Sequence, residues 1–270
     1  SDGAGRRLAV HRLRPLCVDP VRPRRHPVQL GVPARCAGTG KVAVISPGRP
    51  VFDPGSARLM AGSVEHPGDL TSCLQGLNCV VAGCGLDIDV RSQALLAAVL
   101  TSPVAAIIDA DALNMIAANP EIPPLARMLL DRARAWPTIL TPHPLEASRL
   151  LGKSVAQVQA NRIDAALSLA AQTQCTVVLK GAGSIIATPD GRHAINSSGG
   201  PALATGGTGD MLAGLIGGFL AQGHTAWDSA AIGVWVHGSA ADQWSIENPR
   251  ASGLDSNQLL RRMVSVVNTC

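Results

Sequence analysis

The sequence predicts an α/β protein built as a doubly wound sandwich, in which helices cover both faces of a mostly parallel sheet. Three observations lead to this fold class: short β-branched runs recur after residue 40, helical segments lie between them, and the chain ends in helices alone. The composition agrees, because 46% of the residues are hydrophobic while only 2% are aromatic. A core of Ala, Val, Leu and Ile suits helices packed closely on a sheet. The 270 residues fit one domain over 1–270, and no linker divides them.

The predicted strands are apolar on both sides, as is typical of strands buried within a parallel sheet. A hairpin is also expected over 184–196, where the pattern alternates around Asp190 and Gly191. The five runs are KVAVIS (41–46), NCVVAG (78–83), VAAIIDA (104–110), TILTP (138–142) and TVVLKG (176–181).

The clearest predicted helix covers 155–172, where Ser154 and Gln157 can form a capping box ahead of a helical apolar stripe. Pro144 can open another helix after the fourth strand. The remaining predicted helices are 91–100, 125–135, 210–222, 227–244 and 254–267.

Residues 11–37 do not fit this alternation. They are crowded with Arg, and prolines at 15, 20, 23, 27 and 33 forbid a continuous helix. The segment is either a basic irregular arm or a stretch whose sequence is wrong.

Charge and cysteine content narrow the class of protein. The net charge of +4 is mild and comes largely from arginines before residue 35, which argues against a nucleic-acid surface. No apolar run reaches the roughly 18 residues that a membrane span needs. Seven cysteines without C-x-x-C spacing indicate reduced thiols in a cytoplasmic protein rather than disulfides or a zinc site.

The segment GGTGD, residues 206–210, is the strongest candidate for chemistry. Its glycines allow a close backbone approach, and the apolar helix behind them presents unpaired N–H groups suited to phosphate. Asp210 in the first turn either stabilises the helix dipole or takes a proton from a hydroxyl that attacks bound phosphate.

Three further segments follow predicted strands, at the edge where open α/β sheets bind ligands. Lys180 of LKGAGS could reach a phosphate, and the glycines beside it would let a ligand approach the backbone. His143 is held between two prolines, and is either a structural histidine or a site residue. Asp109 and Asp111 either orient a metal or ligand or cap the next helix.

Two phosphate-binding motifs are excluded. VAGCGLDID, residues 81–89, lacks the third glycine of a dinucleotide fingerprint, because Ile88 stands there. GTGK, residues 38–41, is not a Walker motif, because Arg35 and Val42 occupy its first and last positions.

Five motifs in order resemble the ADP-dependent NAD(P)H-hydrate dehydratase family, which has the ribokinase-like fold, a three-layer α/β/α sandwich. They are VAGCGLDID (81–89), DADALN (109–114), TPHPLE (141–146), LKGAGS (179–184) and NSSGGPALATGGTGDMLAG (196–214). The resemblance runs from about Gly40 to the C-terminus.

The resemblance implies a carbon–oxygen lyase that repairs a damaged cofactor. Its substrate would be the S epimer of hydrated NADH or NADPH, and ADP or ATP would drive dehydration with Mg²⁺ neutralising phosphate charge. The family is usually a homotetramer. An epimerase domain is sometimes fused to it, and we expect none here, so repair of the R epimer would need a separate epimerase.

The motifs also imply site residues. Asp210 would be the catalytic base and would contact the hydrated cofactor, together with Gly85 and His143. Asn196 would support phosphate or metal, and no metal ligand is assigned. The adenine nucleotide would be held by Lys180, Gly181, Ala182, Gly183, Ser184 and Gly209.

The sequence departs from the family pattern at three positions. The family usually has Pro where Cys84 stands, often Gly where Asp87 stands, and Gly where Leu145 stands. None of these changes removes a chemically required group. The larger departure is 11–37, where the family has a strand, a turn and a helix. Our hypothesis is that this segment is an out-of-frame translation, which an uninterrupted reading frame in resequenced DNA would contradict. If the segment is genuine, we expect it to lack the first strand and helix of the family.

Two other functions stay open. A ribokinase-like kinase of a vitamin precursor shares the GTGD segment, but such kinases usually carry Asn after TP and lack DADALN. A nucleotide-binding regulator without catalysis would not need Asp210.

Overall fold

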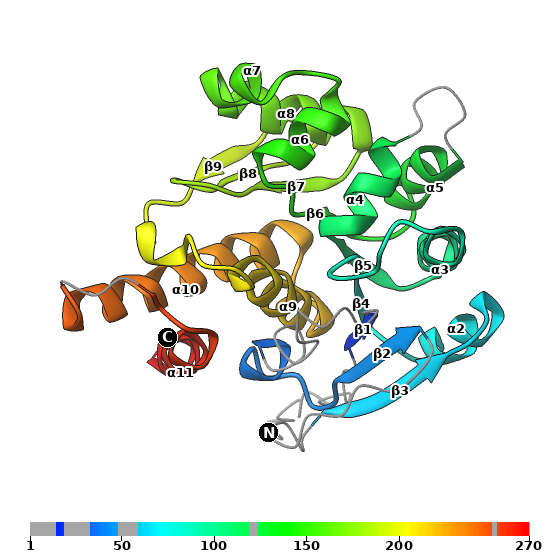
Figure 1. Ribbon diagram of the computed structural model, residues 1–270, viewed down its shortest axis with the longest axis horizontal. Coiled ribbons are helices and arrows are strands. Elements are labelled where there is room, and N and C mark those ends of the chain that lie inside the picture. The colour runs from blue at the N-terminus through cyan, green and yellow to red at the C-terminus, as the bar shows by residue number, and fades with distance from the viewer. Residues whose placement is uncertain (1–14, 19–32, 48–58, 119–123, 250–252, 270) are drawn as a thin grey trace, which may run out of the picture.

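The computed structural model describes residues 15–18, 33–47, 59–118, 124–249 and 253–269. The strands of these segments form one sheet in the order β3-β2-β1-β4-β5-β6-β7-β8-β9 (Figure 1). Neighbouring strands from β3 to β7 pair in parallel, and β8 and β9 extend the sheet in antiparallel fashion. The predicted mostly parallel sheet is therefore confirmed.

The five predicted β-branched runs all form strands, and the predicted hairpin forms β8 and β9. Two strands were not predicted: β1, Pro15–Val18, and β3, Met60–Val64, whose sequence MAGSV lacks a β-branched run. The other bounds are β2 Ala43–Pro47, β4 Cys79–Ala82, β5 Ala105–Ile108, β6 Thr138–Leu140, β7 Thr176–Leu179, β8 Ile185–Ala187 and β9 His193–Ile195.

Part of the anomalous segment 11–37 enters the sheet. Residues Pro15–Val18 form β1, which pairs in parallel with both β2 and β4. A helical turn covers 33–36, and Thr39 Oγ1 donates to the carbonyl of Ala34 at 2.6 Å. The expectation that the segment lacks a strand is wrong for 15–18, while 11–14 and 19–32 lie outside the described residues.

One predicted helix is divided. Residues 155–172 form α7, Val155–Ala160, and α8, Arg162–Thr173, rather than one helix. Asn161 interrupts them with a φ of −143°, and its side chain accepts a hydrogen bond from the backbone N–H of Asp164. The capping box of Ser154 and Gln157 is confirmed.

The other predicted helices are confirmed within a few residues. They are α3 Val90–Thr101, α5 Pro124–Ala133, α9 Thr208–Ala221, α10 Ala226–Glu247 and α11 Ser256–Thr269. Three shorter helices follow strands: α2 Pro67–Leu74, α4 Ala110–Ala117 and α6 Pro144–Leu151.

The sheet lies between two helical layers (Figure 1). Val80 and Ala82 of β4 pack in a core with α2 to α8, whereas Cys79 and Val81 face α9 and α10. A further core joins α9 and α10 to α11. In the part of the chain that the structure describes, no helix is long and apolar enough to cross a membrane.

Candidate active site

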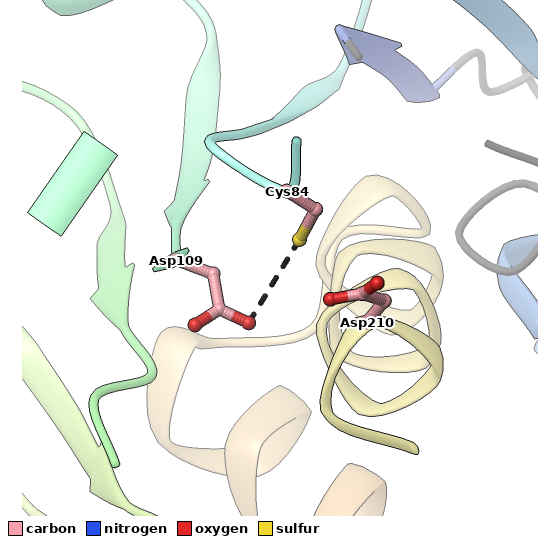
Figure 2. A group of neighbouring side chains, drawn as sticks. All are labelled: Cys84, Asp109 and Asp210. Atoms are coloured by element: carbon pink, nitrogen blue, oxygen red, sulfur yellow. Dashed lines mark hydrogen bonds between the residues drawn. The ribbon is translucent and has the colours of Figure 1, made fainter. Parts of the chain in front are cut away.

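Three side chains from three elements meet at the carboxyl ends of the parallel strands. Cys84 follows β4, Asp109 follows β5 and Asp210 lies in the first turn of α9 (Figure 2). All three are buried, and one ligand atom from each lies within 4.8 Å of the other two. The Cys84 thiol donates to Asp109 Oδ2 with an S···O distance of 3.9 Å. The sequence predicted that ligand-binding residues lie at this edge of the sheet, and the structure adds the Cys84 side chain to them.

The loop after β4 is held against the start of α4 by its backbone. The Asp109 N–H donates to the carbonyl of Ala82 at 3.0 Å, and the Asp111 N–H donates to that of Gly83 at 3.1 Å. Gly83 has a φ of +119°, and a Cβ there would lie 1.9 Å from the Asp109 carbonyl oxygen. Glycine is therefore required for Cys84 to reach Asp109.

Asp109 caps the next helix, which is one of the two roles that the sequence left open, and its orientation of a metal or ligand stays a prediction. Its Oδ1 accepts from the backbone N–H of Ala110 at 2.8 Å, so it caps α4, and from Lys180 Nζ at 2.7 Å. Burial acts to lower the pKa of Lys180, but Asp109 and Glu146 outweigh it and raise that pKa. Lys180 is thus a cation held at the site. Asp111 instead accepts from the Asp87 backbone N–H at 3.0 Å.

His143 is the N-cap of α6. Its Nδ1 accepts from the backbone N–H groups of Leu145 and Glu146 at 3.1 and 3.2 Å, and its Nε2 lies 3.1 Å from Glu146 Oε1. The proton must sit on Nε2 in this arrangement, because Nδ1 accepts. Burial, followed by the Lys180 charge, lowers the pKa of His143. The imidazole is therefore structural, while almost half of its surface remains exposed.

Glu146 is a buried acid in the same cluster. Its side chain is 4% exposed, and burial raises its pKa to about 7, with Lys180 acting in the opposite direction. Its Oε2 accepts from the His143 backbone N–H at 2.8 Å, which completes the capping box.

A cavity of about 490 Å³ opens beside this cluster. Its wall contains every residue predicted to bind the nucleotide: Lys180, Gly181, Ala182, Gly183, Ser184 and Gly209. It also contains Asn196 and the loop 198–201. The wall does not include Gly85, His143 or Asp210. The predicted site residues therefore form two groups, one in the cavity wall and one outside it. The ion pair of Lys180 with Asp109 links the cavity wall to the cluster of Cys84, Asp109 and Asp210.

The start of α9 borders both groups. Gly207 precedes the helix with a φ of +92° and provides no side-chain cap, and the positive end of the helix dipole at this terminus favours an anion. A Cβ at Gly209 would lie 3.4 Å from Lys180 Nζ, which puts the ammonium next to this helix terminus. Asp210, the third residue of α9, is buried.

Asn196 has a demonstrable structural role. Its Nδ2 donates to the carbonyls of Ser198 and Val234 at 3.0 and 3.2 Å, and its Oδ1 accepts from Ser198 Oγ at 3.0 Å. These bonds fix the cavity wall to α10. Its support of phosphate or metal stays a prediction.

Two residues near the cavity were not singled out from the sequence. His237 of α10 lines the wall, and burial lowers the pKa of this histidine to about 4, so it is neutral near pH 7. Arg162 of α8 bonds the backbone of the loop that carries Lys180. Neither residue lies in a glycine-rich or strand-end motif, which is why the pattern did not reveal them.

The carboxylates fit the divalent cation that the resemblance implies. Asp109 and Asp210 present oxygen atoms from two different elements, and carboxylate oxygens are preferred ligands of Mg²⁺. The Cys84 sulfur is a ligand type that Mg²⁺ does not favour. An aspartate rather than the thiol would therefore hold Mg²⁺ here.

Comparison with known proteins agrees with the fold and the motifs. The family model for NAD(P)H-hydrate dehydratase matches residues 31–264. The chain belongs to this family. The match to the NAD(P)H-hydrate dehydratase family begins within the anomalous segment, so β1 lies before it.

Relatives with assigned names fall in the same family. The ADP-dependent (S)-NAD(P)H-hydrate dehydratase of Neisseria meningitidis is 43% identical over 189 residues, which cover 68% of this chain and 61% of the relative. The bifunctional NAD(P)H-hydrate repair enzyme of Coxiella burnetii is 35% identical over 232 residues, covering 86% and 45%. The chain thus spans about half to three-fifths of the length of these relatives.

Solved structures confirm the ribokinase-like class. The ADP/ATP-dependent NAD(P)H-hydrate dehydratase of Bacillus subtilis, co-crystallised with ATP/Mg²⁺ and soaked with CoA, has a TM-score of 0.77 and 26% identity, covering 97% of this chain and 93% of that one. The hydroxyethylthiazole kinase of Pyrococcus horikoshii has a TM-score of 0.62 at 16% identity, covering 96% and 89%, and so shares the fold alone.

Proposed function

We propose that this protein catalyses the ADP-dependent dehydration of the S epimer of hydrated NADH or NADPH back to NADH or NADPH. The observation that carries the proposal is the junction at α9, where Asp210 lies in the same helical turn as Gly209 of the cavity wall. A carboxylate and a phosphate-sized anion hole are thereby adjacent. Membership of the NAD(P)H-hydrate dehydratase family supports the substrate class.

In this proposal the nucleotide occupies the cavity and the hydrated ring lies against Gly85, His143 and Asp210. Asp210 accepts the proton of the ring hydroxyl while that oxygen attacks the terminal phosphorus of ADP, releasing AMP. The phosphate ester then leaves as inorganic phosphate, and the adjacent ring carbon loses a proton, which restores the double bond. Lys180 and the first N–H groups of α9 stabilise the charge on the transferred phosphoryl group.

Mg²⁺, when bound with the nucleotide, would supply further neutralisation of phosphate charge, and Asp109 would hold it while Asp210 acts as the proton acceptor. The burial of both aspartates excludes bulk water from this region. The ammonium of Lys180, 2.7 Å from Asp109 Oδ1, balances part of the negative charge until the cation and nucleotide arrive.

The decisive assay is the recovery of absorbance at 340 nm from hydrated NADH with ADP and Mg²⁺. We expect recovery that requires ADP and yields AMP and phosphate in equal amounts. A chain that produces no NADH and instead phosphorylates a vitamin alcohol would be a kinase. ATP in place of ADP would measure the nucleotide preference.

Assembly, location and domain count remain part of the proposal. By family resemblance we propose a cytoplasmic homotetramer with one domain and a separate epimerase for the R epimer. Size-exclusion chromatography with light scattering would test the assembly.

A further inference from the structure

Arg162 stands behind the loop that forms one side of the cavity. It is the first residue of α8, after the interruption at Asn161 that divides α7 from α8. Its Nη2 donates to the carbonyls of Leu179 and Lys180 at 3.3 and 3.4 Å, and its Nη1 donates to the carbonyl of Ala182. One guanidinium thus bonds three of four successive carbonyls, at positions 179, 180 and 182.

The opposite side of the same loop faces the cavity, because Lys180 to Ser184 all line its wall. Carbonyls that are directed to Arg162 are directed away from a ligand in the cavity. This orientation matters for an anionic ligand, which backbone carbonyls would repel and N–H groups would attract.

Gly181 gives the guanidinium its access to the loop. A Cβ at this position would lie 2.8 Å from Arg162 Nη2, and the residue has a φ of +146°. The sequence interpretation was that Gly181 lets a ligand approach the backbone. That interpretation stays a prediction, and the geometry adds that its missing side chain makes room for Arg162.

The charge of Arg162 has no acidic partner in the described segments, where no carboxylate lies within 4.0 Å of its guanidinium. Burial lowers the pKa of this arginine. Carbonyl dipoles compensate part of the charge, and the remainder adds to the positive potential that Lys180 creates at the cavity.

We propose that Arg162 is a positioning residue of the nucleotide site, which fixes the 180–184 loop in the shape that receives the diphosphate. The inference rests on the cavity being the ADP site of the proposed function. It adds a residue outside the motifs and gives a reason for an arginine without an acidic partner in the described segments to lie against a glycine.

Direct binding of ADP, measured by titration calorimetry, tests this. We expect R162Q and R162K each to weaken ADP binding by about 10–100-fold, because several hydrogen bonds to a charged group are lost. Lysine does not restore binding, since one ammonium cannot replace the planar fork that bonds three carbonyls. The affinity for NADPH, an intact analogue of the other ligand, should stay within twofold in both variants.

The matched control is R127Q, which removes an exposed arginine paired with Asp131. It should leave ADP binding unchanged. Thermal unfolding identifies any variant that does not fold, and R162K, with its long stem and charge, is the variant that best preserves packing. ADP binding of wild-type strength in folded R162K, or equal losses for ADP and NADPH, would overturn the proposal.

A double-mutant cycle with G181A supplies a second test. In the wild-type background the added methyl displaces Arg162, so ADP binding should weaken strongly. In the R162Q background the same methyl should cost much less, and equal losses in both backgrounds would overturn the link between the two residues.

These readouts do not depend on dehydration. A chain that shows this binding pattern without restoring NADH would refute the proposed activity and support the role of Arg162. A wild-type chain that does not bind ADP would overturn the inference itself.

Discussion

Lys180 and Asp109 form a buried ion pair between the ends of β7 and β5, which β6 separates in the sheet, with 2.7 Å between Nζ and Oδ1. The pair is shielded from water, since the Asp109 side chain is 1% exposed and the Lys180 side chain 18% exposed. It connects the carboxylate cluster to the cavity and orders both sides of the site. Its removal should therefore affect stability as well as binding.

Breaking the pair from one side should be more harmful than replacing both partners. K180M leaves a buried carboxylate without its cation, which typically costs about 3–5 kcal/mol of unfolding free energy. In D109N/K180M the loss should be smaller than the sum of the single losses, because asparagine is neutral and still caps α4. Urea unfolding at pH 7 measures the free energy of unfolding of D109N, K180M and D109N/K180M. Strictly additive losses would show that the pair is not coupled.

Replacement of Asp210 separates a catalytic base from a helix-dipole residue. D210N should lower turnover by about 10²–10⁴-fold, as expected when a proton acceptor is lost, and spare ADP binding. The matched control is D228N, because Asp228 is likewise an acid in the first turn of a helix, α10. It should lose only about 0.3–1 kcal/mol of stability and no activity. Unchanged turnover in D210N would reject the base.

The pKa of Glu146 predicts a pH-dependent stability. Burial raises this pKa to about 7 from 4.5, so between these values the folded protein binds more protons than the unfolded chain. The free energy of unfolding should therefore fall as the pH rises from 4.5 to beyond 7, by roughly 3 kcal/mol from this group. E146Q keeps the capping box and should remove the decrease. Urea unfolding from pH 5 to 8 measures the free energy of unfolding of the wild-type protein and of E146Q. The same pH dependence in both proteins would contradict the raised pKa of Glu146.

Much of the framework was predictable because it depends on local pattern. The five β-branched runs formed parallel strands, and strand ends of parallel neighbours necessarily share an edge. The strand β3 was missed because MAGSV has no β-branched run, and its place at the sheet edge comes from pairing with β2. The division of α7 from α8 was missed because the apolar stripe continues across Asn161, whose backbone alone leaves the helical region.

The sequence indicated candidate site residues at the strand ends, whose roles stay predictions, but it did not indicate their contacts. Lys180 and Asp109 each stood at a predicted strand end, yet they are 71 positions apart, and nothing in their motifs indicates which carboxylate the ammonium meets. The contact of Cys84 with Asp109 depends on the turn at Gly83, which places the loop after β4 against Asp109. Arg162 belongs to the helix before β7, so its contact with the loop depends on how α8 packs on the sheet.

His143 allows its capping role to be separated from the predicted contact with the hydrated cofactor. H143N places an amide oxygen where Nδ1 now accepts the two backbone bonds, and asparagine is among the best N-cap residues. The variant should keep its unfolding free energy within about 0.5 kcal/mol. If the imidazole binds substrate, KM for hydrated NADH should rise about tenfold or more while ADP affinity stays constant. Unchanged KM with retained stability would leave His143 with only its structural role.

Gly83 and Gly152 offer a test of why glycine is required beside Cys84. Both have positive φ, +119° and +62°, but a Cβ at Gly83 would lie 1.9 Å from the Asp109 carbonyl oxygen, while one at Gly152 meets nothing within 4 Å. G152A should lose about 1 kcal/mol through backbone strain alone. G83A should lose at least about 3 kcal/mol and, in whatever fraction folds, should separate Cys84 from Asp109 and reduce turnover. Thermal and urea unfolding of the two variants give the comparison. Equal, small losses would mean that the loop after β4 can move away from Asp109, and that the cluster of Cys84, Asp109 and Asp210 does not depend on this glycine.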